Sequence, residues 1–307
     1  MKTIFLFPGQ GSQYVGMGKQ LADSHDGCRK LLQEADDVLG FKLSELMAGG
    51  PEDDLKATQN TQPALYVVSQ MAALVLSENG IKPDLAAGHS LGEYSALAAV
   101  GAISFADGLR LVRLRGNLMA EAGVRRPGAM AAVLGLEAAA LDSVLKGVAG
   151  TVVSANYNCP GQIVISGEVA SVEAAMEACS AAGAKKVVRL PVSGAFHSPL
   201  MEYALEGLRE GLAKASFLKP SCPVIANVDA VAHDNPAEFA DLLAKQLVSP
   251  VRWEDSMRFA VAQGVARGVE AGAGKVLMGL MRSIDRAISV TPVESVEAAV
   301  ALNGSLR

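Results

Sequence analysis

Gly88-His89-Ser90-Leu91-Gly92 is the stretch of this 307-residue sequence that decides the fold. It lies between a short apolar segment at 84–87, which predicts a strand, and an alanine-rich segment at 93–100, which predicts a helix. A serine at the apex of a sharp turn from strand to helix is the arrangement of a nucleophile elbow, in which glycines let the strand and the helix approach closely. The same pattern also occurs by chance, so the alternative is a helix-entry turn that Ser90 caps.

The predicted turn gives Ser90 surroundings suited to chemistry. It aims the hydroxyl outward, and the helix behind it presents free backbone N–H groups and the positive end of its dipole. A negatively charged oxygen that formed beside Ser90 would be stabilised there. The sequence therefore predicts a nucleophilic serine with an oxyanion site next to it.

The composition bounds the class of protein. With 307 residues and 50% hydrophobic content, the chain can bury a core as one large domain, or as one domain with a smaller insert. The 27 basic and 32 acidic residues leave a mild net charge of -5. No basic block interleaved with aromatic residues is present in the sequence, so we expect no nucleic-acid binding.

Cysteines and apolar runs suggest where the protein works. The four cysteines are scattered without metal-type spacing, which is typical of reduced thiols in a cytosolic protein. The apolar run at 4–8 is too short for a signal peptide, and no stretch reaches the roughly 18 apolar residues of a membrane span. We therefore expect a cytoplasmic protein with no metal site and no membrane contact.

The order of predicted elements indicates an α/β protein with an inserted domain. A buried strand at 4–7 ends in a glycine-rich loop, 9–13, whose spacing fits neither a dinucleotide-binding motif nor a P-loop. Helices are predicted near 17–23, 28–39, 63–79 and 104–121, and later strands at 224–227 and 268–270. From about 125 the order becomes β-α-β-β-α-β, as in ferredoxin-like domains, with strands at 129–134, 151–155, 162–166 and 185–190 and helices at 137–146 and 171–182.

A serine nucleophile needs a base, and histidine is the usual one near neutral pH. Of the four histidines, His25 and His233 lie in sequences typical of solvated turns. His89 precedes Ser90 on the strand side, so its side chain should leave on the opposite face. His197 remains, framed by small and apolar residues, and elimination favours it as the base over a packed core histidine.

Arg115 is predicted to point into the protein. Its neighbours three and four positions away along the helix are all apolar: Leu111, Val112, Leu118 and Met119. The corresponding neighbours of Arg113 are more polar. A buried guanidinium stays charged and needs a partner. Two interpretations remain open, namely an internal ion pair with an Asp or Glu and a two-point grip on a substrate carboxylate.

Three amide side chains occupy positions suited to a site. Gln10 follows the end of a buried strand, where it can aim an amide or a backbone N–H at the elbow. Asn158 and Gln162 flank a turn around Pro160 and Gly161 and are placed to line a cleft, although a purely structural turn is the default interpretation there.

The assembled residues resemble the malonyl-CoA:acyl carrier protein transacylases, an acyltransferase family of fatty-acid and polyketide synthesis. The order and spacing of the matching motifs run through almost the whole chain. These motifs are Phe7-Pro8-Gly9-Gln10-Gly11-Ser12-Gln13, Thr61-Gln62-Pro63-Ala64, Gly88-His89-Ser90-Leu91-Gly92-Glu93, Arg113-Leu114-Arg115-Gly116, Asn158-Cys159-Pro160-Gly161-Gln162, Gly194-Ala195-Phe196-His197-Ser198-Pro199 and Gln246-Leu247-Val248-Ser249-Pro250-Val251-Arg252-Trp253.

The resemblance implies an architecture and an activity. The fold would be an α/β-hydrolase-like large domain, 1–124 and 193–307, interrupted by a ferredoxin-like small domain, 125–192, with the active site between them. The enzyme would be an S-malonyltransferase that moves malonyl from malonyl-CoA to the phosphopantetheine thiol of an acyl carrier protein by ping-pong acyl transfer. The carrier supplies the phosphopantetheine, so no resident cofactor is expected.

The resemblance also implies roles for single residues. Ser90 would carry the malonyl ester and His197 would act as the base. The backbone N–H groups of Gln10 and Leu91 would form the oxyanion hole, and Arg115 would pair with the malonyl carboxylate.

The remaining positions carried over from the family orient and enclose these groups. The main-chain carbonyl of Gln246 would orient the histidine in place of an acidic side chain. His89, Asn158, Gln162 and Phe196 would line the pocket, and a phenylalanine at 196 resembles the malonyl-type pattern.

Several alternatives remain open at this stage. A serine hydrolase with the same elbow would release a free acid, and an inactive binding protein of an acyl-carrier assembly would form no adduct. Within the transferases, a polyketide pathway or a malonate decarboxylase carrier stands beside fatty-acid synthesis. The expected partners are malonyl-CoA and an acyl carrier protein, and the expected state is a monomer.

A local basic surface is the expected docking site, since carrier proteins of this family context are acidic and so is this chain. The candidates lie at the edges of the insert and are equally consistent with a solvated face: Arg125, Arg126, Lys185, Lys186 and Arg189.

Overall fold

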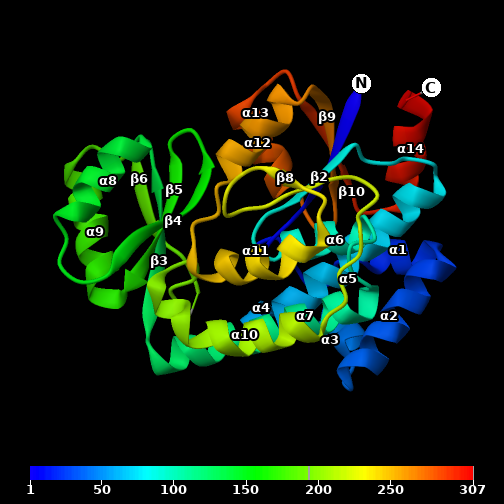
Figure 1. Ribbon diagram of the computed structural model, residues 1–307, viewed down its shortest axis with the longest axis horizontal. Coiled ribbons are helices and arrows are strands. Elements are labelled where there is room, and N and C mark those ends of the chain that lie inside the picture. Colours follow the sequence, from blue (N-terminus) through cyan, green and yellow to red (C-terminus); the bar gives the residue numbers. More distant parts are fainter. Residues whose placement is uncertain (193, 307) are drawn as a thin grey trace.

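A computed structural model describes residues 1–192 and 194–306 of the chain (Figure 1). Ser193, where the sequence predicts that the large domain resumes, and the terminal Arg307 lie outside the described residues. No helix within these ranges is long and apolar enough to cross a membrane.

The described residues form two sheets, of which the larger has six strands in the order β10-β9-β1-β2-β7-β8. Neighbouring strands are parallel except for the pair β7–β8 at one edge. The strands are β1 (Lys2–Phe7), β2 (Leu85–Gly88), β7 (Val224–Ile225), β8 (Ala232–His233), β9 (Val265–Ala271) and β10 (Ser289–Val293).

Helices cover both faces of this sheet, as expected for parallel strands whose faces are buried (Figure 1). Those of the large domain are α1 (Lys19–Ser24), α2 (Asp26–Leu39), α3 (Leu43–Gly49), α4 (Glu52–Lys56), α5 (Thr58–Glu78), α6 (Gly92–Ala99), α7 (Phe105–Arg125), α10 (Glu202–Lys214), α11 (Pro236–Val248), α12 (Trp253–Ala262), α13 (Val276–Ile284) and α14 (Val296–Leu306), with a 3₁₀ turn η1 at Pro199–Met201.

The central strand β1 divides the core because successive side chains of a strand point to opposite faces. Phe5 and Phe7 join the larger apolar cluster, which includes buried residues of α5, α6 and α7. Ile4 and Leu6 join a second cluster with Trp253 of α12 and residues of α13. The sheet is therefore held between two apolar layers.

The smaller sheet has four antiparallel strands in the order β4-β5-β3-β6. Its strands are β3 (Gly128–Leu134), β4 (Val152–Cys159), β5 (Gln162–Glu168) and β6 (Lys186–Arg189), and its helices are α8 (Ala138–Lys146) and α9 (Val169–Ala181). The element order β-α-β-β-α-β is the one predicted. The helices bury a separate apolar cluster against the sheet.

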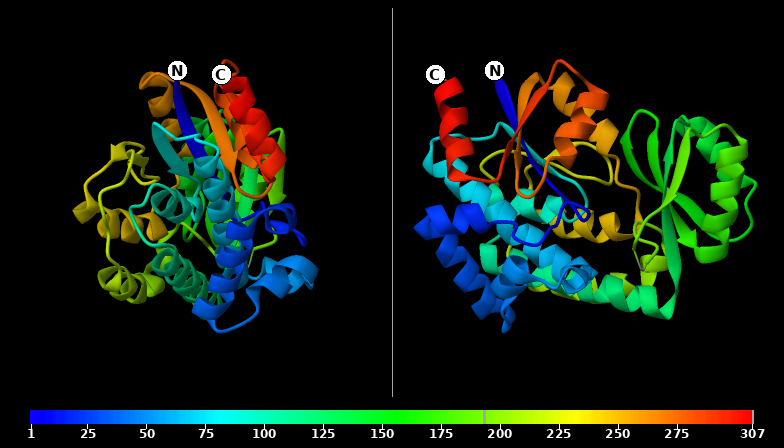
Figure 2. Two further views of the ribbon diagram at one scale, coloured as in Figure 1. Left: turned by 90° about the vertical axis from the view of Figure 1, so that its right-hand side faces the viewer. Right: turned by 180° about the vertical axis from the view of Figure 1, so that it is seen from behind.

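The small sheet stands at one end of the molecule, opposite the two termini (Figure 2). The long helix α7 leads into it. A second link comes from the segment between α11 and α12, where the N–H of Val251 donates to the carbonyl of Ala155 at 2.8 Å and Tyr157 donates back at 2.9 Å. This segment follows Gln246 closely, so one short stretch of chain touches both parts of the molecule.

The predicted fold class is confirmed: a mostly parallel sheet with helices, together with a four-stranded antiparallel subdomain. The strands of the small sheet fall inside the predicted range 125–192, whose exact limits stay a prediction. The structure adds β8, β10 and the short helices α3 and α4, and it gives bounds to the later helices α10 to α14, which the sequence predicted without bounds. Helix α5 begins at Thr58, whereas the sequence predicted its start at Pro63, five residues later.

The early start of α5 has a physical explanation. Proline lacks an N–H and leaves the carbonyl four residues before it without its helical partner. That carbonyl belongs to Gln59, and the guanidinium of Arg113 on α7 donates to it at 2.6 Å. A tertiary contact thus compensates for a proline inside the first turns of the helix.

Glycines make the elbow between β2 and α6 possible. A Cβ atom on Gly88 would overlap the backbone of Gly92, and one on Gly92 would overlap the carbonyl of Phe7 at the end of β1. Gly9, in the loop after β1, lies equally close to the backbone of His89. The elbow and the first loop therefore touch backbone to backbone.

Gly88→Ala should lower the free energy of unfolding by about 3 kcal/mol, because the obstacle is fixed backbone that cannot move aside cheaply. The matched control is Gly279→Ala in α13, where nothing lies within 4 Å of the added Cβ. The control should raise stability by ~0.5–1 kcal/mol. Urea denaturation of both variants measures the difference, and equal midpoints would contradict the close packing of the elbow.

Candidate active site

Ser90 occupies a strained position at the apex of the elbow. Its φ is +53°, in the left-handed region that non-glycine residues rarely adopt. The Ser90 N–H donates to Oδ1 of Asn227 at 2.7 Å, and Nδ2 of Asn227 donates to the Gly88 carbonyl at 2.7 Å. One amide side chain therefore satisfies both backbone groups that the sharp turn leaves without helical or strand partners.

His197 is placed to act as the base toward Ser90. Its Nε2 lies 2.7 Å from Ser90 Oγ, and its Nδ1 lies 2.9 Å from the main-chain carbonyl of Gln246. A carbonyl only accepts, so Nδ1 carries the hydrogen and Nε2 is free to accept the hydroxyl proton. The arrangement is a serine–histidine pair in which a backbone carbonyl orients the ring.

The imidazole is held neutral. His197 is only 4% exposed, and burial lowers its pKa to about 3, with the positive charge of Arg115 adding to the effect. The base is therefore unprotonated and ready to accept a proton throughout the neutral pH range. Its φ of +56° is a second strained position in the same site.

The inward position of Arg115 is confirmed, since its side chain is 1% exposed. Its Nη2 donates to Ser90 Oγ and to Gln246 Oε1, each at 3.0 Å, and its Nη1 donates to Gln62 Oε1 at 2.9 Å. None of the ion pairs between described residues involves Arg115. Burial lowers its pKa, but a guanidinium keeps its charge.

These contacts decide between the two interpretations of Arg115. All three of its hydrogen-bond acceptors are neutral, so the internal ion pair is not formed. A buried cation beside the nucleophile is thus left with its charge available to an anionic group.

The two residues predicted to form the oxyanion hole lie at the cavity with Ser90. Gln10 and Leu91 both line the cavity at this point, and neither N–H has a hydrogen-bond partner among the described residues. The side chain of Gln10 turns to Thr58, whose Oγ1 lies 3.4 Å from Gln10 Nε2. Their role as an oxyanion hole stays a prediction.

A cavity of about 290 Å³ opens onto these groups. It runs between the large sheet and the small sheet, and residues of β3, β4 and β5 form its far wall. Asn158, Gln162 and Phe196, which the sequence predicts at the pocket, all line it, as do the apolar side chains Met119, Met130, Val164, Leu190 and Val192.

His89 lies at the pocket, where the family resemblance places it. Its Nε2 lies 2.9 Å from Asn158 Oδ1, its ring packs against Trp253 at 5.5 Å between centroids, and the residue lines the same cavity as Ser90. Trp253 belongs to the second apolar cluster, with Ile4 and Leu6, and the face on which the ring leaves relative to Ser90 stays a prediction. Burial lowers the pKa of His89 and keeps this ring neutral too.

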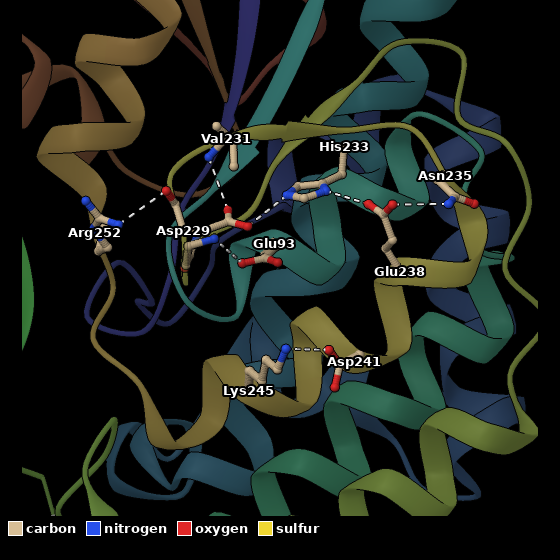
Figure 3. A network of polar contacts seen from close by, with 10 residues as sticks. Glu93, Asp229, Val231, His233, Asn235, Glu238, Asp241, Lys245 and Arg252 are labelled. Atoms are coloured by element: carbon tan, nitrogen blue, oxygen red, sulfur yellow. Dashed lines mark hydrogen bonds and ion pairs between the residues drawn. The ribbon is translucent and has the colours of Figure 1, made fainter.

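Sequence reasoning missed the residues behind the nucleophile. Glu93 is 2% exposed, and its Oε2 accepts from the Asn227 N–H at 2.9 Å and from Gln246 Nε2 at 2.8 Å. Figure 3 shows Glu93 beside Asp229, whose carboxylate meets the ring of His233 at 3.0 Å. The available signal was that Glu93 is the only charged residue of the segment 92–99.

The basic residues predicted for docking are partly paired within the chain. Arg125 bonds Glu121 at 2.9 Å, and Arg189 bonds Glu173. Within the described residues, no group of three or more His, Cys, Asp or Glu side chains is arranged to hold a metal ion.

The geometry suits acyl transfer through a covalent serine ester. A hydroxyl in contact with a neutral imidazole supplies a nucleophile and a base, and two cavity-lining residues have backbone N–H groups without a partner among the described residues. Arg115 adds a fixed positive charge within reach of a bound acyl chain.

Comparison with known families agrees with this chemistry. The model of the acyl transferase domain family matches residues 4–300. A malonyl CoA-acyl carrier protein transacylase of Bacillus subtilis (strain 168) is 47% identical over 305 residues, 97% of this chain and 96% of the relative. Its counterpart in Escherichia coli (strain K12) is 46% identical over 283 residues, 91% of this chain and 92% of the relative.

Solved structures are equally similar. The malonyl CoA-acyl carrier protein transacylase of Coxiella burnetii superposes with a TM-score of 0.97 at 37% identity, covering 100% of this chain and 98% of that one. A malonyl-transacylase solved in complex with a type II PKS acyl-carrier protein gives 0.96 at 40% identity, covering 99% and 100%.

The low pKa of His197 predicts reactivity that persists in mild acid. Labelling of Ser90 by a fluorophosphonate should slow less than about twofold between pH 8 and pH 5, because the imidazole stays unprotonated above its pKa of about 3. An ordinary histidine would be largely protonated at pH 5. The measurement is the labelling rate by mass spectrometry, with return from pH 5 to pH 7.5 as the control for unfolding. A titration with a midpoint near 6.5 would contradict the buried, neutral base.

Proposed function

The chain belongs to the malonyl CoA-acyl carrier protein transacylases of the acyl transferase domain family, and we propose that it transfers the malonyl group through an ester on Ser90. Its activity is the transfer of malonyl to acyl carrier protein, as the names of its close relatives state. The observation that carries the proposed route is the 3.0 Å contact between Arg115 Nη2 and Ser90 Oγ. It joins a buried, unneutralised cation to a nucleophile.

In the first half-reaction, Ser90 attacks the thioester carbonyl of malonyl-CoA. His197 Nε2 accepts the hydroxyl proton, and the tetrahedral oxyanion faces the N–H groups of Gln10 and Leu91. When the carbon–sulfur bond breaks, His197 returns the proton to the sulfur of CoA. Malonyl remains as an ester on Ser90 and the imidazole is neutral again.

The second half-reaction reverses these steps with another thiol. The phosphopantetheine arm of the carrier enters the cavity, His197 accepts the thiol proton, and the sulfur attacks the ester carbonyl. The same oxyanion site stabilises the second tetrahedral intermediate, and Ser90 leaves with its proton restored. Both ends of the exchange are thioesters, so the reaction runs in either direction.

Arg115 selects and aligns the acyl group. Its guanidinium binds the free carboxylate of malonyl in the charge-assisted manner that suits a planar, two-point donor. Holding that end places the reacting carbonyl at Ser90, so the contact contributes to rate as well as to selectivity. The neutral acceptors Gln62 and Gln246 hold the guanidinium without competing for its charge.

We further propose the organisation that frames this chemistry. Residues 1–124 and 193–307 form the catalytic domain and 125–192 the small domain, whose Asn158 and Gln162 line the channel for the pantetheine arm. The proposed state is a monomer, since one chain supplies every residue of the mechanism. A cytoplasmic location suits the four cysteines, all free and buried.

The test of the route is the fate of the acyl group. Mixing the enzyme with malonyl-CoA should give a malonyl adduct on Ser90 by peptide mass spectrometry, and Ser90→Ala should give none. Adding a pantetheinylated carrier protein should move the adduct to the carrier at least about tenfold faster than free malonate appears. Faster release of malonate than loading of the carrier would identify a hydrolase and contradict the proposal.

Arg115→Ala should lose malonyl transfer far more than acetyl transfer. Removing a charge-assisted, two-point contact costs about 2–4 kcal/mol, which is roughly 30- to 1000-fold in kcat/KM for malonyl-CoA. The matched control is Arg110→Ala on the exposed side of the same helix, where the arginine pairs with Asp107 at 3.1 Å. The comparison of both donors decides the role, because an equal fall for malonyl and acetyl would rule out carboxylate recognition.

A further inference from the structure

One buried acid lies directly behind the nucleophile and takes no part in the mechanism above. Glu93 belongs to the first turn of α6, three residues after Ser90, and is 2% exposed. A carboxyl group this deep in a protein carries a large desolvation cost unless it is well hydrogen-bonded. Its position therefore calls for an explanation in terms of what it holds.

A single oxygen of Glu93 accepts hydrogen bonds from two residues, and these residues bind the N–H and the carbonyl of Ser90. Oε2 accepts from the Asn227 N–H at 2.9 Å and from Gln246 Nε2 at 2.8 Å. Asn227 Oδ1 accepts the Ser90 N–H at 2.7 Å, and Gln246 Nε2 donates to the Ser90 carbonyl at 2.9 Å. Both backbone groups of the strained serine are thus bound by partners of Glu93.

The Gln246 contact extends this hold to the other two reacting residues. Its amide nitrogen faces two acceptors, the Ser90 carbonyl and Glu93, so its amide oxygen is directed to Arg115 at 3.0 Å. Its main-chain carbonyl accepts from His197 Nδ1 at 2.9 Å. Glu93 therefore lies one hydrogen bond away from a residue that contacts serine, histidine and arginine.

We propose that Glu93 is a positioning residue for malonyl transfer. Through one carboxyl oxygen it fixes Asn227 and Gln246. These two residues in turn keep Ser90, His197 and Arg115 in their relative positions. The inference rests on the proposed function, since it concerns the rate and the selectivity of that reaction. Glu93 itself touches no reacting atom.

The two hydrogen bonds to Glu93 require an acceptor oxygen but no negative charge. Burial raises the pKa of Glu93 to about 7, with Asp229 adding to the rise and the hydrogen bonds and Arg115 opposing it. Both hydrogen bonds fall on Oε2, so a proton on the other oxygen leaves them intact. An amide oxygen at the same place can accept both hydrogen bonds as well, which makes glutamine the conservative replacement.

The experiment compares Glu93→Gln with Glu93→Met by single-turnover acylation from malonyl-CoA and from acetyl-CoA. Glu93→Gln should stay within about threefold of the native chain, whereas Glu93→Met should lose about 10- to 100-fold in acylation rate with little change in KM. Malonyl transfer should fall further than acetyl transfer, because the Gln246 amide also orients Arg115.

Asp36→Asn is the matched control, because Asp36 is another buried carboxylate that accepts two hydrogen bonds, from the N–H and hydroxyl of Ser44 on α3. It should lower the melting temperature and leave the acylation rate and the donor preference unchanged. A positioning role differs from a merely structural one in that only Glu93→Met changes the ratio of the two donors.

Three outcomes would overturn the inference: a folded Glu93→Met variant with native rates, an equal loss in Glu93→Gln, or an equal fall for both donors. Should Glu93→Met not fold, Glu93→Asp replaces it, because the shorter arm keeps the charge but cannot reach both donors, and native rates there would overturn the inference too. A native chain that forms no adduct with malonyl-CoA would instead refute the proposed function, so the two failures are distinguishable.

Discussion

The site depends on the hydrogen bonds that fix the backbone of one strained serine. Ser90 stands in the left-handed region with its N–H bound to Asn227 and its carbonyl bound to Gln246, which lie on segments far apart in the sequence. Glycines before and after it let strand, turn and first loop meet with no side chains between them. From this fixed point the hydroxyl reaches His197 and Arg115.

The charges around the serine are arranged so that one cation remains uncompensated. Arg115 is bound by two glutamine oxygens, and the amide of Gln246 lies between it and the buried acid Glu93. The same cation and the burial of the ring keep His197 neutral. A direct ion pair would have stabilised the guanidinium but removed the charge that recognises a carboxylate. Amide groups solve this problem because they satisfy hydrogen bonds without adding charge.

The features of the fold and the site that could be predicted from the sequence are those whose signal lies within one segment of the chain. The strand–Ser90–helix order, the apolar neighbours of Arg115 and the β-α-β-β-α-β order each lie within one segment, and the structure agrees with all three. Contacts between segments far apart in the sequence leave weaker signals in the sequence. A backbone carbonyl exists at every position, so the Gln246 contact came only from family resemblance, and the joint role of Asn227 and Glu93 needs three segments in contact. The place of His89 at the pocket likewise came from family resemblance.

The two backbone hydrogen bonds between the Val251 segment and β4 have a wider consequence. They are the link by which the stretch after Gln246 meets the small sheet, while the serine and its base stay anchored on the large one. The reacting groups and the far wall of the channel therefore belong to separate scaffolds. Substitutions in that wall can therefore change the space for an acyl chain without moving Ser90 or His197.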